Sequence, residues 1–225
     1  MIQSRAYHGL QFTIARFSSD KVCYILLPEG LKEDGISWME KAADEFGCNI
    51  IVISGMDWNN DLTPWPAKGI FKKEKDFGGK ASLFLKDLIE DYFVSIESSI
   101  GIYTAERTLV GISLSGLFAI WASTRTDKFQ NIASISGSMW YDDFVERFSS
   151  LPINPAVRKF FVSLGDKEKK SKDQRMSKVE DATNEVVNII KRSGVPVDYV
   201  IDDGTHFSPI IPRLQAALNS LYAGC

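Results

Sequence analysis

The sequence predicts a single α/β domain with a mainly parallel central sheet and helices on both faces. Three observations predict this fold class. Apolar runs of strand length alternate with amphipathic helical patterns along all 225 residues. The runs are continuous, as in strands that are buried on both faces. No repeat, low-complexity segment or change in composition divides the chain, so residues 1–225 are expected to form one domain.

The expected strands and helices follow one another in regular order. Strands are predicted at residues 10–17, 21–27, 49–54, 108–112, 132–135, 160–164 and 196–201. Helices are predicted at 36–46, 80–98 and 173–192, with an apolar helix starting at 116, a helix ending near 148 and a closing helix at 209–222. This alternation predicts right-handed crossovers between parallel strands.

The clearest signals come early in the chain. Residues 22–27 are apolar throughout and stop at a Pro-Glu-Gly turn, as in a buried strand. Residues 36–46 place apolar side chains at helical spacing and stop at Gly47. Residues 55–66 are rich in tryptophan, proline, aspartate and asparagine. Their apolar residues follow neither the helical period of 3.6 residues nor the strand period of two, which predicts a loop.

Composition excludes several classes of function. The net charge of -3 and the lack of a basic face argue against nucleic-acid binding. No apolar run approaches the roughly 18–20 residues that cross a membrane, and the N-terminus lacks the apolar region of a secretory signal. The three cysteines, Cys23, Cys48 and Cys225, have no metal-binding spacing, so a reducing, cytoplasmic setting is expected.

The most informative stretch is Gly111-Ile112-Ser113-Leu114-Ser115, between a predicted strand and an apolar helix. A serine on a sharp strand-to-helix turn is a nucleophile elbow. Small residues two positions before and after the serine allow the backbone to turn tightly. The backbone N–H of Leu114, at the start of the helix, would point toward an acyl oxyanion.

This pentapeptide departs from Gly-x-Ser-x-Gly at its last position, where Ser115 stands. A nucleophile at Ser115 would need small residues at 113 and 117, but residue 117 is Leu117, so Ser113 is favoured. An ordinary tight turn explains the pentapeptide equally well, and the choice depends on partners downstream.

A serine nucleophile needs a base, and histidine is the usual one. Of the two histidines, His8 precedes the first predicted strand, whereas His206 follows the last one and would lie at the same sheet edge as Ser113. The acid should follow a strand between them. Asp166 and Glu168 both follow the penultimate strand and both remain candidates. Asp202 and Asp203 come just before His206 and are expected to shape its turn.

Five segments together resemble the esterase D branch of the α/β-hydrolases, which includes feruloyl esterases, S-formylglutathione hydrolases, mycolyltransferases and siderophore esterases. They are residues 24–30, 78–79, 111–117, 165–168 and 204–206. The resemblance implies an α/β-hydrolase fold with little or no lid and a triad of Ser113, His206 and Glu168. In the family's Gly-x-x-Asp/Glu loop the acid is at the fourth position, which favours Glu168 over Asp166.

The sequence lacks the His-Gly pair that relatives carry after the second strand, which leaves the second oxyanion donor to be assigned. Backbone N–H groups near Gly30 and Leu31 are the candidates, and the loop at Asp57-Trp58 is the alternative. Four aromatic residues are candidates for the wall of a substrate pocket, although each could instead serve only in packing: Trp58, Trp65, Trp140 and Tyr141.

The implied activity is hydrolysis of a carboxylic ester of a small soluble substrate through an acyl-enzyme on Ser113, with no metal or organic cofactor. The short segment 140–156 leaves room only for a small lid, which suggests an open, shallow site. An acyltransferase or peptidase using the same three residues, or a catalytically silent binding protein, are the alternatives. The identity of the ester and the oligomeric state are not encoded in any recognisable motif.

Overall fold

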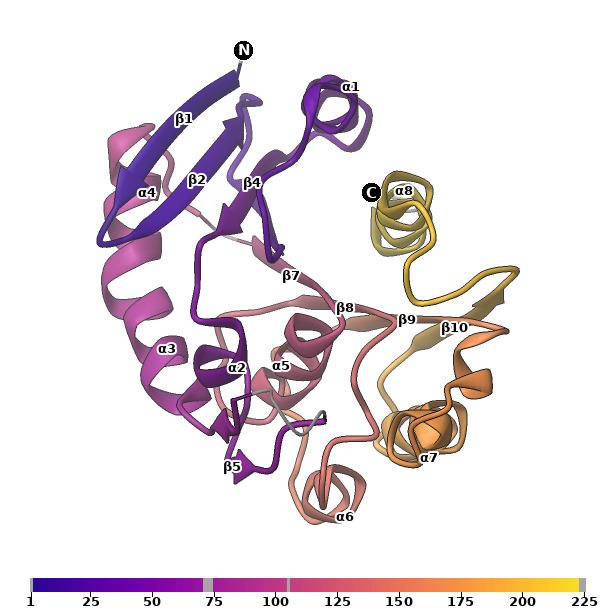
Figure 1. Cartoon of the computed structure of the whole chain (residues 1–225). Coiled ribbons are helices and arrows are strands. Elements are labelled where there is room, and N and C mark those ends of the chain that lie inside the picture. Colours follow the sequence, from indigo (N-terminus) through magenta and orange to yellow (C-terminus); the bar gives the residue numbers. More distant parts are fainter. Residues whose placement is uncertain (1, 71–74, 105, 223–225) are drawn as a thin grey trace.

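The computed structural model describes residues 2–70, 75–104 and 106–222, so Cys225 lies outside the described residues. Its centre is an eight-stranded sheet in the order β1-β2-β4-β3-β7-β8-β9-β10 (Figure 1). The strands are β1 (Ile2–Tyr7), β2 (Leu10–Ala15), β3 (Lys21–Leu26), β4 (Asn49–Ser54), β7 (Glu106–Ile112), β8 (Asn131–Ile135), β9 (Lys159–Gly165) and β10 (Val197–Asp202). From β4 to β10 all neighbours are parallel, whereas β1 and β2 pair antiparallel. The prediction of a mainly parallel sheet is therefore confirmed.

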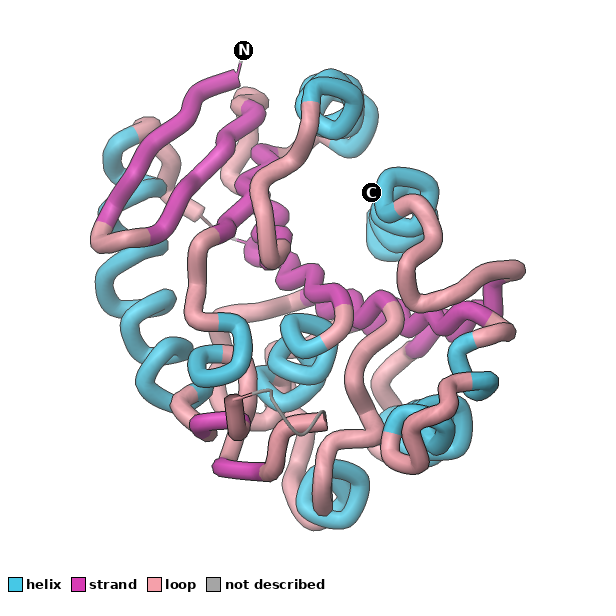
Figure 2. Tube along the Cα trace, viewed as in Figure 1, coloured by secondary structure: helices cyan, strands magenta, loops and turns pink. Residues whose placement is uncertain are grey.

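Helices cover both faces of the sheet, as predicted (Figure 2). The main α-helices are α1 (Glu33–Phe46), α3 (Ala81–Asp87), α4 (Phe93–Ser99), α5 (Leu114–Ala122), α6 (Phe144–Ser149), α7 (Val179–Arg192) and α8 (Ile210–Tyr222). Helices α1 and α8 share one apolar core with one face of the sheet. Helices α3 to α7 share a larger core with the opposite face. No helix in the described ranges has the length and apolar character needed to cross a bilayer.

The first strand, β1, was not predicted from the sequence. Its side chains alternate little in polarity and none is buried, because β1 is an edge strand that pairs only with β2. The hairpin turns at His8 and Gly9, both with positive φ. His8 stacks on Tyr7 and lies 3.4 Å from Asp91, so this histidine belongs to the edge of the sheet.

Two predicted segments have more structure than expected. The helix predicted at 80–98 is divided by a π-helical turn, η1 (Leu88–Tyr92), between α3 and α4. The predicted loop at 55–66 contains the short helix α2 (Trp58–Asp61), and the strand β5 (Pro66–Ala67) at its end pairs with β6 (Phe77–Gly78). These additions pack the loop against the body of the protein.

The parallel strands bring distant parts of the chain to one edge of the sheet. In the strand register, Gly111 near the end of β7 lies beside Leu26 at the end of β3, and Gly165 at the end of β9 lies beside Asp202 at the end of β10. The loops that follow β3, β7, β8, β9 and β10 therefore emerge next to one another, where open α/β sheets place their sites.

Candidate active site

Ser113 occupies a sharp turn between β7 and α5. Its backbone has φ 58° and ψ -122°, a strained conformation for a residue with a side chain. The turn requires glycine at 111, because a Cβ atom there would lie 2.0 Å from the carbonyl oxygen of Ser115. The N–H of Ser113 donates to the carbonyl of Ile135 over 3.0 Å, which holds the turn against β8. The predicted elbow geometry is present.

Ser115 has a different environment from Ser113. It is fully buried, and its Oγ accepts a hydrogen bond from the N–H of Ile112 over 2.7 Å. The same Oγ lies 2.8 Å from the carbonyl oxygen of Ile112 and 2.8 Å from that of Leu26, either of which can accept its single proton. The hydroxyl that replaces the usual glycine therefore connects the turn to the end of β3.

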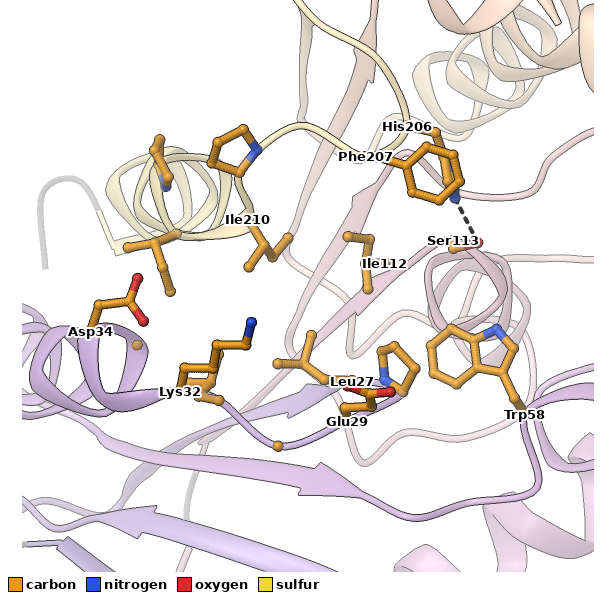
Figure 3. Close-up of a pocket in the computed structure, with 17 residues that line it drawn as sticks. Leu27, Glu29, Lys32, Asp34, Trp58, Ile112, Ser113, His206, Phe207 and Ile210 are labelled. Carbon is orange, nitrogen blue, oxygen red and sulfur yellow. Dashed lines mark hydrogen bonds between the residues drawn. The ribbon is translucent and has the colours of Figure 1, made fainter.

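Three of the predicted side chains meet at the sheet edge. Ser113 Oγ lies 3.1 Å from Nε2 of His206 (Figure 3). On the other side of the ring, Nδ1 of His206 lies 2.9 Å from Oε2 of Glu168. The residues come from the turn after β7, the loop after β10 and the short 3₁₀ turn η2 (Glu168–Lys170) after β9. This chain of contacts has the geometry in which an imidazole takes a proton from a hydroxyl while a carboxylate orients the ring.

Asp166 points elsewhere. Its Oδ1 accepts a hydrogen bond from the N–H of Gly204 over 3.0 Å and so stabilises the loop that carries His206. Asp202 and Asp203 likewise shape the turn, because Asp202 pairs with Arg213 at 3.1 Å and Asp203 pairs with Lys167. Of the two acids left open by the residues alone, the structure brings Glu168 to the histidine.

The carboxylate of Glu168 is almost completely buried and is held on both oxygens. Oε1 accepts hydrogen bonds from the hydroxyl of Ser136 and from the N–H of Gly165, the latter over 2.8 Å. Burial by itself would raise the pKa of Glu168, but the hydrogen bonds from His206, Ser136 and Gly165 outweigh it, so the pKa lies below its ordinary value. Glu168 is therefore a carboxylate at neutral pH.

Arg213, at the start of α8, lies behind Glu168 and was not found from the sequence. Its side chain is only 6% exposed, and Nη2 lies 3.7 Å from Oε1 of Glu168 and donates to Ser136. Nε donates to Asp202 over 3.1 Å. The only signal in the sequence was an arginine inside an otherwise apolar helix start, next to Leu214. Ser136 follows β8 and has φ 48°. The sequence did not point to it either, because its role depends on contacts with Glu168 and Arg213, which are distant in the chain.

Replacing Arg213 with methionine is expected to destabilise the protein by about 3–5 kcal/mol, because Asp202 and Glu168 would lose a buried partner. Chemical denaturation with urea would measure the change in the free energy of unfolding. Arg192→Met is the matched control, since Arg192 is exposed, and it should change the free energy by about 0.5 kcal/mol or less. Equal effects of the two substitutions would contradict the role of Arg213.

Two cavities flank His206 and Phe207, which line both. The larger, of about 800 Å³, contains Ser113 and Trp58, whereas the smaller, of about 230 Å³, contains Trp140. Of the four predicted pocket aromatics, these two line the cavities next to the histidine. In the described ranges, no group of three or more His, Cys, Asp or Glu side chains is arranged to hold a metal ion.

Trp65 and Tyr141 lie outside both cavities. Nε1 of Trp65 donates to the carbonyl of Asp142 over 2.9 Å, and Arg147 lies over its ring at 4.5 Å. The Tyr141 hydroxyl donates to the carbonyl of Trp65 over 2.5 Å. These two aromatics therefore fasten the segment after β4 to the segment before α6, which is the packing alternative considered for them.

The structure narrows the choice of a second oxyanion donor. The N–H of Leu27 donates to the carbonyl of Ile53 over 3.0 Å, and Pro28 has no N–H. The N–H of Asp57 donates to its own loop at Asp61 over 2.8 Å. Gly30, Leu31 and Trp58 line the same cavity as Ser113, so their N–H groups remain the candidates, and Leu114 is the first residue of α5.

Comparisons with known proteins agree with this fold. Residues 35–206 match the sequence profile of a family described as "Putative esterase". An uncharacterized protein of Bacillus subtilis (strain 168), YbbA, is 29% identical over 182 residues, which covers 78% of this chain and 72% of that protein.

Among solved structures, an IroE-like serine hydrolase from Shewanella oneidensis has a TM-score of 0.79 at 19% identity, covering 99% of this chain and 80% of the other. The siderophore hydrolase EstA from Aspergillus nidulans has a TM-score of 0.71 at 19% identity, covering 99% of this chain and 93% of the other. At such identities the likeness concerns the fold. Because the family profile spans well over half of the chain, the protein belongs to this esterase family of the α/β-hydrolases.

Proposed function

We propose that this member of the esterase family hydrolyses carboxylic esters of small soluble substrates through an acyl-enzyme on Ser113. The observation that carries the proposal is the unbroken chain of contacts from Ser113 through His206 to Glu168, at 3.1 Å and 2.9 Å. A serine hydroxyl is a weak nucleophile at neutral pH unless a base takes its proton, and His206 Nε2 lies within reach to do so.

In the first step, Ser113 Oγ attacks the ester carbonyl as its proton passes to His206 Nε2. Glu168 accepts the Nδ1–H of the ring, fixes its orientation and stabilises the imidazolium. The oxyanion is stabilised by the N–H of Leu114 and by a second N–H from Gly30 or Leu31, each worth about 3 kcal/mol when well placed. The alcohol leaves with the proton held by His206, and water then attacks the acyl-enzyme with His206 again as base. The bond between the acyl carbon and Ser113 Oγ breaks, His206 returns the proton to Oγ, and the acid is released.

Labelling with a fluorophosphonate probe tests whether the serine is activated. The native protein should be modified on the tryptic peptide 108–125, with the mass increase on Ser113, because only a serine beside a base reacts quickly. Heat-denatured protein, which lacks the contact with His206, serves as the control and should not react. If native protein neither reacts nor hydrolyses p-nitrophenyl acetate, the fold would serve as a binding protein without turnover.

A reducing, cytoplasmic setting is part of the same proposal. Cys23 and Cys48 are both buried with free thiols. Burial raises the pKa of each thiol, to about 12 for Cys48, so both stay protonated and unreactive at neutral pH. They serve as small core residues and take no part in the chemistry proposed for Ser113.

A further inference from the structure

We infer that the larger cavity binds the acyl part of the ester and that this part is an apolar group larger than butyryl. The inference rests on the proposed function, because it assigns the substrate of the same site, and it replaces the open, shallow site that the short segment 140–156 suggested with a larger apolar one. A cavity of about 800 Å³ lies in the upper part of the range of roughly 300–1,000 Å³ typical of small-molecule sites. An acetyl or butyryl group would leave most of it unfilled.

The lining of this cavity is mainly apolar, and apart from Trp58 it comes from three parts of the chain. Leu27 and Leu31 follow β3, Ile112 ends β7, and Ile210 and Ile211 begin α8. Figure 3 shows Ser113 and His206 at one end, Ile112 and Ile210 along the middle, and Asp34 at the opposite end. Glu29 and Lys32 line the same cavity between these ends. A chain bound to Ser113 would therefore contact the aliphatic side chains of Ile112 and Ile210 and would pass the two charged side chains on the opposite wall.

The two cavities differ in the catalytic side chains that line them, which assigns the two halves of the ester. Ser113 lines only the larger cavity, whereas Glu168 lines only the smaller one, beyond Phe207. The departing alcohol must take its proton from His206, and the water that follows must give a proton to the same nitrogen. His206 lines both cavities, so the alcohol and the water can reach it from the smaller one, whereas the acyl group stays attached to Ser113 and extends into the cavity that Ser113 lines.

The backbone candidates for oxyanion binding lie in the larger cavity as well. Gly30 and Leu31 line the larger cavity next to Ser113, so the carbonyl of the bound ester would face that side. Phe207 is 90% exposed and stands between the two cavities. An exposed aromatic continuous with an apolar groove is typical of a ligand-binding surface.

A series of p-nitrophenyl esters of linear acids measures the size of the acyl group. From acetate to at least hexanoate, kcat/KM should rise by about two- to four-fold for each added methylene, because each one leaves water for an apolar surface. A second series of 4-alkylphenyl acetates, in which only the alcohol grows, should change much less. A flat acyl series, or a steeper rise in the alcohol series, would overturn the assignment.

Ile210→Trp should fill the middle of the cavity and lower the ratio of kcat/KM for the octanoyl ester to that for the acetyl ester by about ten-fold. Ile201→Trp is the matched control, because Ile201 is 49% exposed on β10 and does not line the cavity. That control should keep the wild-type ratio. An unchanged ratio in Ile210→Trp, with the protein folded by circular dichroism, would also overturn the inference.

Binding of the free acid separates this inference from the proposed hydrolysis. Octanoate should bind the wild-type protein at least about ten-fold more tightly than butyrate, and this preference should weaken in Ile210→Trp. Titration calorimetry measures both without any turnover. If octanoate binds in this way but no ester is hydrolysed, the proposed function fails and the apolar ligand class stands. If esters are hydrolysed but octanoate and butyrate bind equally, the ligand class fails alone.

Discussion

Replacing Ser113 with alanine is expected to lower kcat for p-nitrophenyl butyrate by a factor on the order of 10⁵, down to the residual rate that binding alone supplies. The reason is geometric: Ser113 Oγ is the hydroxyl that lies 3.1 Å from Nε2 of His206, on a turn that exposes it to the cavity. Initial rates at saturating ester, corrected for spontaneous hydrolysis, measure the change.

Ser115→Ala is the matched control for Ser113→Ala, since the two serines are two positions apart. It should retain most of the activity but lose about 1–3 kcal/mol of stability, because the buried N–H of Ile112 would lose its acceptor at 2.7 Å. In a chain of this size each kcal/mol lowers the melting temperature by about 2–4 °C. If Ser115→Ala abolished hydrolysis and Ser113→Ala did not, the nucleophile would be Ser115.

Glu168→Gln is expected to lower kcat by about 10³–10⁴-fold. The substitution keeps the size of the side chain but removes the charge that stabilises a protonated His206, and its amide can present an N–H to Nδ1, which favours the wrong tautomer. The lowered pKa of Glu168 means that the charge is present at neutral pH, so the variant differs from wild type in the range where the assay is run.

Asp166→Asn provides the comparison for Glu168→Gln. The Asp166 carboxylate accepts only a loop hydrogen bond, from the N–H of Gly204 over 3.0 Å, and an asparagine oxygen can accept the same bond. Its kcat should stay within about three-fold of wild type. A collapse of activity in Asp166→Asn together with an active Glu168→Gln would exchange the roles proposed for the two acids.

Several features followed from the sequence because neighbouring residues determine them. The tight turn at Ser113 depends on Gly111 and on the strand and helix on either side, so five residues were enough to predict it. The position of His206 followed from the alternation of strands and helices, because loops after parallel strands lie at one edge. The resemblance to a family of esterases added the preference for Glu168.

Other features depended on packing between distant elements. Whether Glu168 or Asp166 faces His206 depends on the 3₁₀ turn after β9, which directs the two side chains in different directions. Nothing in the sequence distinguished Trp65 and Tyr141 from Trp58 and Trp140 as candidates for a pocket wall. Hydrogen bonds between residues 76 and 77 positions apart in the chain place Trp65 and Tyr141 in the packing between two segments.

The sequence by itself thus determined the α/β class, the elbow at Ser113 and the two loops that reach it, since periodicity and turn chemistry are local properties. Only the tertiary structure decided that Arg213 and Ser136 hold the buried acid and that an apolar cavity lies on one side of the histidine. Those contacts join residues up to 77 positions apart, and their formation depends on strand register and helix rotation, which no short segment encodes.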